Sequence, residues 1–150
     1  MKGLSSVEKS VTKMNRVFID SNIWVYAFAG NSDPRGAIAQ AFLYDHPNNN
    51  ELVISYQVVN EVTRILKKYG HSEMLLRQTI SNMLNICEFI NFSQNSAILA
   101  SELRETMSIS YWDSHIAASA ILSDCGILAS EDFQDGSIIR GVRIYNIFNL

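Results

Sequence analysis

Short apolar runs alternate with longer helical patterns along this chain, and this alternation limits its possible folds more than any other feature. The runs predicted as strands cover residues 16–19, 51–54, 88–92, 127–129 and 142–145. Helical patterns are predicted over residues 23–29, 34–44, 56–69, 72–87, 93–107 and 110–125. Connections of this length join parallel strands, and parallel sheets are covered by helices. The sequence therefore predicts one α/β domain with a mostly parallel, covered sheet.

The charge balance gives no sign of a nucleic-acid binder. The 150-residue chain has 12 Lys and Arg against 15 Asp and Glu, a net charge of −3, whereas such proteins usually carry an excess of base. A polyanionic substrate would therefore be held by a local basic patch, by metal ions or by another subunit. The candidates for a patch are Arg35, Arg64, Lys67, Lys68, Arg140 and Arg143. A cluster such as 64–68 is also typical of an ordinary solvated helix face.

Sequence features that would direct the chain to a membrane or an oxidising compartment are missing. No apolar run approaches the roughly 18 residues of a membrane span. Residues 1–15 lack the apolar segment of a secretory signal, so we expect a flexible extension ahead of a domain at 16–150. Cys87 and Cys125 form no CxxC pair, which favours two reduced, packed thiols in a cytoplasmic protein.

Asp20 comes directly after the first predicted strand and directly before the first predicted helix. Ligands bind at this carboxyl end of strands in open α/β sheets, although Asp is also a common helix N-cap. Asn22 excludes a phosphatase of the haloacid dehalogenase type, because an amide cannot replace the second carboxylic acid as a proton donor.

Glu61 lies at the edge of an apolar helix face, beside Val58 and Ile65. A glutamate at such a boundary could also pair with Arg64, three residues further along the helix. By its position alone, Glu61 is an ordinary boundary residue as readily as a functional one.

Asp113 follows Ser110 in the S/T-x-x-D/E pattern of a helix cap. It also lies in line with Ile116 and Ala117, so its carboxylate is expected on the packed side of the helix. His115 is rotated by about 200° from Asp113 and is not assigned as a ligand or base. Without cysteines at ligand spacing, a zinc site is not expected.

Residues 130–136 follow the predicted strand 127–129 and contain Glu131, Asp132 and Asp135. A polar turn has the same composition, but an acid beyond a strand repeats the position of Asp20. Carboxylates at neighbouring strand ends repel each other unless a hard divalent cation compensates their charge. The joint placement of these acids therefore favours a metal site.

Five segments occur in a characteristic order: Val17–Ile23 (VFIDSNI), Ile54–Glu61 (ISYQVVNE), Tyr111–Ala120 (YWDSHIAASA), Gly126–Asp132 (GILASED) and Gly141–Ile144 (GVRI). Together they resemble the PIN-domain family, in particular the VapC-type toxins of toxin–antitoxin pairs. The resemblance covers about residues 16–150. It implies a PIN-like three-layer α/β/α fold with a four- or five-stranded, mostly parallel sheet.

The same resemblance implies a Mg²⁺- or Mn²⁺-dependent endoribonuclease. The family carries acids at the positions of Asp20, Glu61, Asp113 and Asp132, and small hydroxyl or amide residues at those of Ser21, Asn22 and Ser130. By resemblance, Asp20, Asp113 and Asp132 are metal ligands. Glu61 joins them through a water molecule and helps to orient the attacking water. Glu131 or Asp135 could supplement or replace Asp132.

The resemblance also implies an RNA substrate, a protein antitoxin and a homodimer. Such an antitoxin commonly blocks the carboxylates with an Arg side chain. The aromatic residues of the first two helices could form a partner surface or pack into the core; they are Trp24, Tyr26, Phe28, Phe42 and Tyr44.

Two other functions stay open on the sequence. One is a catalytically silent binding module with the same fold, against which the complete set of acids argues. The other is a stand-alone RNA-processing nuclease without an antitoxin. A receiver-like domain is excluded, because residues 127–130 provide no Lys at the end of a late strand.

Overall fold

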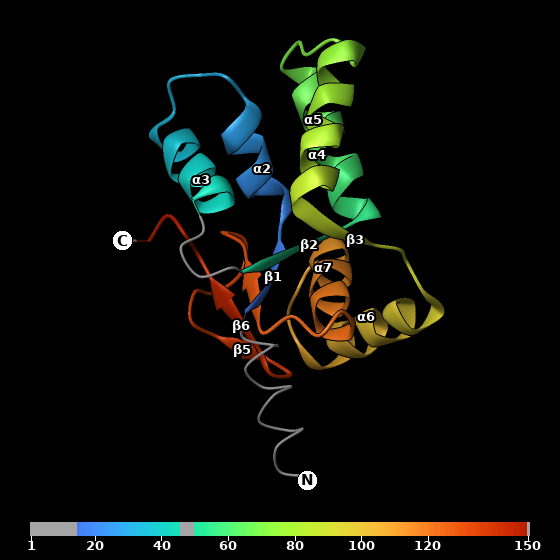
Figure 1. Cartoon of the computed structure of the whole chain (residues 1–150). Helices are drawn as coiled ribbons and strands as arrows, with labels where there is room; N and C mark the ends of the chain where they lie inside the picture. Colours follow the sequence, from blue (N-terminus) through green and yellow to red (C-terminus); the bar gives the residue numbers. More distant parts are fainter. Residues whose placement is uncertain (1–14, 46–49, 150) are drawn as a thin grey trace, which may run out of the picture.

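The computed structural model describes residues 15–45 and 50–149, which form one six-stranded sheet with helices on both sides (Figure 1). The strands are β1 (Arg16–Ile19), β2 (Glu51–Ser55), β3 (Cys87–Ile90), β4 (Ile127–Ala129), β5 (Ile138–Ile139) and β6 (Val142–Tyr145). The helices are α2 (Ser21–Phe28), α3 (Pro34–Tyr44), α4 (Tyr56–Lys68), α5 (Glu73–Ile86), α6 (Gln94–Thr106) and α7 (Tyr111–Leu122). The predicted extension at residues 1–15 lies outside the described residues, apart from Asn15. No helix in the described ranges is long and apolar enough to cross a membrane.

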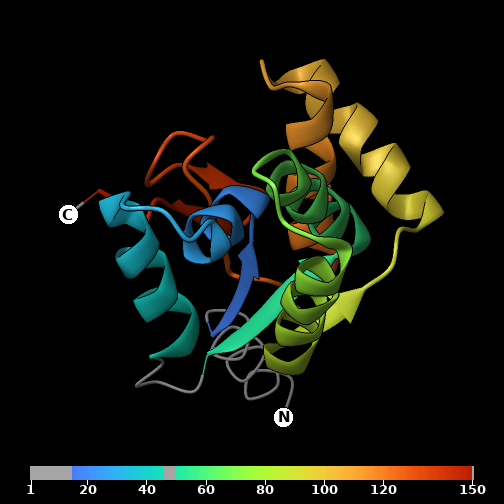
Figure 2. The same cartoon turned by 90° about the horizontal axis from the view of Figure 1, so that it is seen from above.

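The order of the strands distributes the helices over two layers. The sheet order is β3-β2-β1-β4-β6-β5, with every neighbouring pair parallel except β5 and β6. Because crossovers between parallel strands are right-handed, the path from β1 through β2 to β3 puts α2 to α5 on one face. The return from β3 to β4 puts α6 and α7 on the other face (Figure 1). Seen from above, α2 lies between α3 and α4 and contacts both (Figure 2). The predicted α/β/α fold with a mostly parallel sheet is confirmed.

The sheet has one strand more than the sequence predicts. The short β5 pairs antiparallel with β6 through a two-residue turn, Arg140 and Gly141. Both turn residues have positive φ, 46° and 87°, as a type I′ hairpin requires. A strand of two residues is too short to show a periodic pattern, which is why it is not recognised from sequence.

Side chains define the ends of the helices. The N-caps of α3 to α7 each accept a hydrogen bond from a backbone N–H of the first turn; they are Asp33, Ser55, Ser72, Ser93 and Ser110. Helix α7 ends at Leu122, before the predicted end at Cys125. Asp124 takes a positive φ of 58°, and the N–H of Cys125 turns back to the carbonyl of Ala120 at 3.1 Å.

The hydrophobic core surrounds β1 and β4 in the middle of the sheet. Phe18, Ile19 and Leu128 are completely buried. Trp24 is also completely buried and stacks on Phe28, with ring centroids 6.2 Å apart. Trp24 thus belongs to the core, and Phe28 is a partly buried residue that packs against it.

The remaining aromatic residues considered for a partner surface divide between core and surface. Tyr26 and Phe42 pack against the core, and the Phe42 ring lies 6.3 Å from that of Tyr145. Tyr44 is the exposed member, at 49%. Most of the set thus serves packing.

Both cysteines are free thiols, as predicted. Cys125 is completely buried and Cys87 is partly buried. Burial raises the pKa of Cys125 to about 11 and that of Cys87 to about 12. Both therefore stay protonated and unreactive at neutral pH.

We expect Phe18→Ala to lower the free energy of unfolding by about 3–5 kcal/mol, because it leaves a cavity in the centre of the sheet. The matched control is Phe92→Ala, since Phe92 is 67% exposed and its loss should cost within about 0.5 kcal/mol. Urea denaturation of both variants measures the difference. Equal losses would contradict the position of the core.

Candidate active site

The site lies where β1 and β4 end side by side. After β1 the chain returns to β2 on one side, and after β4 it continues to β5 and β6 on the other. This reversal of direction leaves a crevice beyond the carboxyl ends of the two strands, where open α/β sheets bind ligands. The backbone N–H of Asp20 donates to the carbonyl of Ala129 at 3.0 Å, so the two strand ends are joined at the start of the site.

Asp20 is the buried centre of this crevice, with only 2% of its surface exposed. Its Oδ1 accepts from the backbone N–H of Ser21 at 2.7 Å, and its Oδ2 accepts from the Ser130 hydroxyl at 2.7 Å. Burial raises the pKa of Asp20 to about 7, and repulsion by Asp132 and Glu61 adds to the rise, although the two hydrogen bonds oppose it. Asp20 is thus the N-cap of α2, which is one of the two roles predicted for it. It is also an acid whose charged form is disfavoured by burial.

Glu61 reaches the crevice from α4. It accepts from the hydroxyl of Ser21 at 2.8 Å and from Nε2 of Gln57 at 3.0 Å. Its predicted structural partner, Arg64, makes no salt bridge to it in the described part of the chain. The contact with Ser21 ties Glu61 to the loop that carries Asp20.

Asp132 enters from the segment after β4 and is exposed. Its Oδ2 accepts from Nδ2 of Asn22 at 3.1 Å, and its backbone N–H donates to the Ser130 hydroxyl at 3.1 Å. Ser130 therefore orients both Asp20 and Asp132, which makes it the link between the two strand ends.

Asp113 comes from the opposite helix layer, in the first turn of α7. Its backbone N–H donates to Oγ of the N-cap Ser110 at 3.1 Å. Partial burial raises the pKa of its carboxyl group, and the charges of Asp132 and Glu61 add to that rise. Asp113 thus shares one electrostatic environment with acids from α4 and from the segment after β4.

The structure therefore brings all four predicted acids together, each from a different element. The three supporting residues, Ser21, Asn22 and Ser130, each donate a hydrogen bond to at least one of them. Neither Glu131 nor Asp135 takes part. Glu131 pairs with Tyr26 and Arg35, and Asp135 accepts from Asn146 and Asn149 in a turn.

The donor set of the crevice suits a hard divalent cation. Carboxylate, hydroxyl and amide oxygens are the ligands that Mg²⁺ and Mn²⁺ use. Burial raises the pKa of Asp20, and the charges of Asp132 and Glu61 add to the rise, so a bound cation would stabilise the ionised form of Asp20. The Oδ1 of Asn22 is buried without a hydrogen-bond partner among the described residues. Within those residues no group of three His, Cys, Asp or Glu side chains lies close enough together to hold a metal ion. Mg²⁺ keeps several water ligands and is often bound through only one or two carboxylates.

Two residues at the site, Gln57 and Tyr26, were not predicted from the sequence. Gln57 bridges the two helix layers, because its Nε2 lies 3.0 Å from Oε1 of Glu61 and 3.3 Å from the carbonyl of Trp112. Its spacing of four residues from Glu61 could have indicated the first contact. Tyr26 donates to Oε1 of Glu131 at 2.6 Å across 105 residues, and no local pattern encodes that contact.

A model of the PIN domain family matches residues 17–134, which include β2 to β4, all of β1 except Arg16, and every predicted site residue. The chain belongs to the PIN domain family. A search among curated proteins found no match.

Solved structures with the same fold as this PIN domain include a toxin and a toxin–antitoxin complex. A toxin–antitoxin complex from Klebsiella pneumoniae aligns with a TM-score of 0.68 at 25% identity, over 89% of this chain and 99% of that one. VapC20 of Mycobacterium tuberculosis is described as a toxin that cleaves the sarcin-ricin loop. It aligns with a TM-score of 0.64 at 17% identity, over 85% of this chain and 98% of that one. VapBC2 of Rickettsia felis, bound to a DNA fragment from its promoter, aligns with a TM-score of 0.64 at 22% identity, over 87% of this chain and 98% of that one.

The raised pKa of Asp20 predicts a pH-dependent stability for the metal-free protein. The folded protein keeps the Asp20 proton up to a pH of about 7, whereas the unfolded chain releases it near 3.9. The contribution of Asp20 to the free energy of unfolding therefore falls as the pH rises through this window. With a chelator present, the native chain should lose stability relative to Asp20→Asn between pH 5 and pH 8. Urea denaturation of both proteins at pH 5 and at pH 8 measures the difference in their free energies of unfolding.

Asp135→Asn is the control for that experiment. Hydrogen bonds from Asn146 and Asn149 lower the pKa of Asp135, so its stabilisation is present above its unfolded pKa and is lost only as the pH falls further. The difference in the free energy of unfolding between this variant and the native chain should be the same at pH 5 and at pH 8. A constant difference between the native chain and Asp20→Asn would contradict the assignment.

The Tyr26 contact should hold the segment that carries Asp132. The Tyr26 hydroxyl accepts from Arg35 at 2.7 Å and donates to Glu131 at 2.6 Å. We expect Tyr26→Phe to lower the free energy of unfolding by about 1 kcal/mol, and a double-mutant cycle with Glu131→Gln to show coupling. Tyr69→Phe, with its ring 60% exposed, is the control. Additive effects in the cycle would refute the contact.

Proposed function

We propose that this PIN domain is a metal-dependent endoribonuclease that hydrolyses phosphodiester bonds in RNA, with Mg²⁺ or Mn²⁺ as its cofactor. One observation carries the proposal. The carboxylates of Asp20, Glu61, Asp113 and Asp132 come from four different elements and repel one another within a single crevice. A fold gains no stability from such an arrangement, and acids concentrated at one place are typical of functional sites.

The protein's own residues divide the work between holding and orienting. Asp20, Asp113 and Asp132 would hold the cation, and Ser130 sets the relative orientation of Asp20 and Asp132 through its two hydrogen bonds. Glu61, held by Ser21 and Gln57, would orient the attacking water and accept its proton. When bound, Mg²⁺ or Mn²⁺ lowers the pKa of water and stabilises negative charge on the phosphate and the leaving oxygen.

Two considerations support RNA as the substrate. The chain belongs to the PIN domain family, and one protein of the same fold is described as a toxin that cleaves the sarcin-ricin loop. A bound divalent cation would also offset part of the negative charge of the carboxylates and could bind a phosphate oxygen directly. A protein with a net charge of −3 could in this way bind phosphate at this point.

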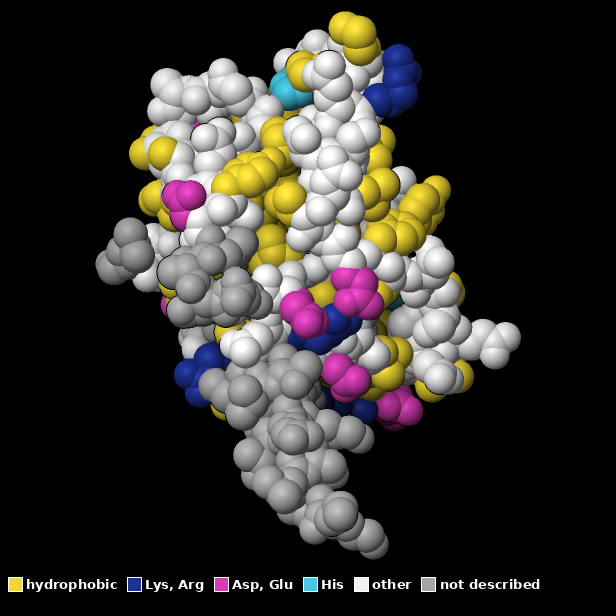
Figure 3. Space-filling model, viewed as in Figure 1, with side chains coloured by type: hydrophobic (Ala, Val, Ile, Leu, Met, Phe, Trp, Pro, Cys, Tyr) yellow, Lys and Arg dark blue, Asp and Glu magenta, His cyan; other side chains and the backbone are white. Residues whose placement is uncertain are grey.

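We further propose that the protein is the toxin of a type II toxin–antitoxin pair, active in the cytoplasm and dimeric. Proteins of the same fold include toxins in complex with antitoxins. Hydrophobic side chains also gather on the face between the α2–α3 and α4–α5 helix pairs (Figure 3). Exposed apolar patches of this kind mark protein contacts, and Met74, Leu75 and Leu84 of α5 are exposed. A stand-alone RNA-processing nuclease would need no such surface.

The proposal predicts that the native chain cleaves RNA with Mg²⁺ or Mn²⁺ and that a chelator abolishes the cleavage. Asp20→Asn and Asp113→Asn should each lower the rate at least about 100-fold, because even residues that only orient metal ligands contribute about 10–100-fold. Gel analysis of a labelled RNA with the purified variants measures the rate.

Asp135→Asn serves as the matched control, since Asp135 is an acid of the same loop that contacts only a neighbouring turn. It should cleave at the native rate. Cleavage that survives chelation, or equal rates in all variants, would refute the mechanism. A chain that binds RNA without cleaving it would favour the catalytically silent binding module.

A further inference from the structure

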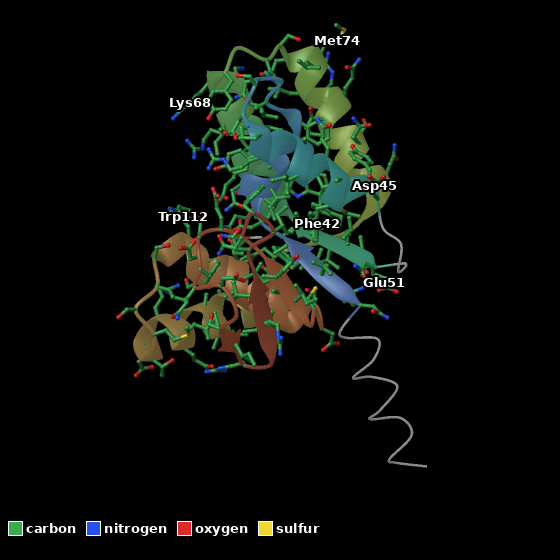
Figure 4. The ribbon with its side chains drawn as sticks, turned by 90° about the vertical axis from the view of Figure 1, so that its left-hand side faces the viewer. Phe42, Asp45, Glu51, Lys68, Met74 and Trp112 are labelled. Atoms are coloured by element: carbon green, nitrogen blue, oxygen red, sulfur yellow. The ribbon has the colours of Figure 1, made fainter. Side chains whose placement is uncertain are left out.

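The first turn of α7 carries Asp113 to the crevice. Trp112, the residue before Asp113, marks this turn on the surface of the molecule (Figure 4). The backbone N–H of Asp113 donates to Oγ of Ser110 at 3.1 Å, and the backbone N–H of Ser114 donates to the carbonyl of Ser110 at 3.0 Å. These bonds form the turn, but they do not attach it to any other element. The position of the Asp113 carboxylate therefore depends on what holds the turn from outside.

Arg104 of α6 binds this turn at two points. Its Nη1 donates to the Ser114 hydroxyl at 2.7 Å, and its guanidinium lies over the Tyr111 ring, 4.5 Å from the ring centroid. The Ser114 hydroxyl in turn donates to the carbonyl of Tyr111. Tyr111 comes two residues before Asp113 and Ser114 comes directly after it. One side chain of α6 thus holds the turn on both sides of the acid.

The stability of the helices does not account for these contacts. Arg104 lies in the last turn of α6, where a cation is favoured by the helix dipole, but an exposed side chain would serve the dipole equally well. Arg104 is partly buried and makes no salt bridge within the described residues. Its hydrogen-bond partner Ser114 is completely buried and neutral. Partial burial of a charge without a carboxylate partner costs free energy.

The metal-free crevice needs such an anchor, because its charges push Asp113 away. Burial raises the pKa of Asp113, and the charges of Asp132 and Glu61 raise it further. This repulsion acts on the first turn of a helix, which is where helices fray. Tyr111 and Trp112, the first two residues of α7, are both more than half exposed, so few packing contacts of their own hold them in place.

We propose that Arg104 is a positioning residue of the active site, which holds the first turn of α7 so that the Asp113 carboxylate can bind the metal ion. The inference rests on the proposed metal-dependent function and adds a residue from α6, a helix that contributes no acid to the site. Arg104 acts through Ser114 and Tyr111 and not by contact with the ion. Residues that orient a metal ligand in this way contribute about 10–100-fold to metal affinity.

Mn²⁺ binding without RNA tests the inference by the sign of the effect. Loss of the positive charge in Arg104→Ala would by electrostatics alone strengthen the binding of a cation, whereas loss of positioning weakens it. We expect Arg104→Ala to bind Mn²⁺ about 10-fold more weakly than the native chain. The electron paramagnetic resonance signal of free Mn²⁺ measures the affinity, and circular dichroism confirms that the variant is folded. Unchanged or tighter binding would overturn the inference.

Ser114→Ala provides a second test that leaves the charge and the packing of Arg104 in place. It should also weaken Mn²⁺ binding, and the double variant should bind like Arg104→Ala, because both changes remove the same contact. Ser123→Ala is the matched control, since the Ser123 hydroxyl donates to the carbonyl of Ser119 at the other end of α7. It should bind Mn²⁺ like the native chain. Additive losses in the double variant would contradict the role of Ser114.

RNA cleavage separates the inference from the proposed function. Arg104→Ala should cleave RNA more slowly than the native chain at limiting Mn²⁺, approach the native rate at saturating Mn²⁺, and keep the native KM for RNA. A rate that stays low at saturating Mn²⁺ would overturn the positioning of a metal ligand. Mn²⁺ binding that depends on Arg104 in a chain that cleaves no RNA would support the inference and reject the nuclease. Cleavage with equal Mn²⁺ affinities in all variants would do the reverse.

Discussion

Burying the Asp20 carboxylate between β1 and β4 costs free energy, because the group loses its hydration and faces other acids nearby. The structure offsets part of this cost with the Ser130 hydroxyl and the Ser21 backbone N–H. The part of the cost that is not offset raises the pKa of Asp20 to about 7. Both neighbouring segments donate to this carboxylate: Ser21, the first residue of α2, through its backbone N–H, and Ser130, after β4, through its hydroxyl. A bound cation would relieve the same charge that the metal-free fold tolerates.

The distribution of helices over two layers gives the site its chemistry. Asp20 and Asp132 follow adjacent strands, but Glu61 and Asp113 belong to helices on opposite faces of the sheet. Gln57 spans the gap between these helices. Right-handed crossovers in both directions from β1 bring the two helices to one end of the sheet, so the acids meet from both sides of the crevice.

The acidic net charge and an RNA substrate are compatible because charge is separated locally. The acids gather in one crevice that suits a cation, whereas Arg64, Lys67 and Arg77 lie along hollows that lead away from it. A protein of this composition can therefore bind a polyanion through a small surface.

The sequence by itself determined the class of fold, the positions of Asp20 and Asp132 after strands, and the caps of the helices. These features depend on hydrophobic periodicity and on hydrogen bonds between near neighbours, both of which are written in local order. It did not reveal β5, whose two residues are too few for a pattern, and it left open whether Trp24 and Phe28 pack into the core or form a partner surface. Glu61 and Asp113 looked as much like a boundary residue and a cap as like functional acids. Only the tertiary structure decided that they face Asp20 and Asp132 and that Glu131 instead binds Tyr26. These contacts join residues far apart in the chain, and their distances are set by the order of the strands and the packing of the layers.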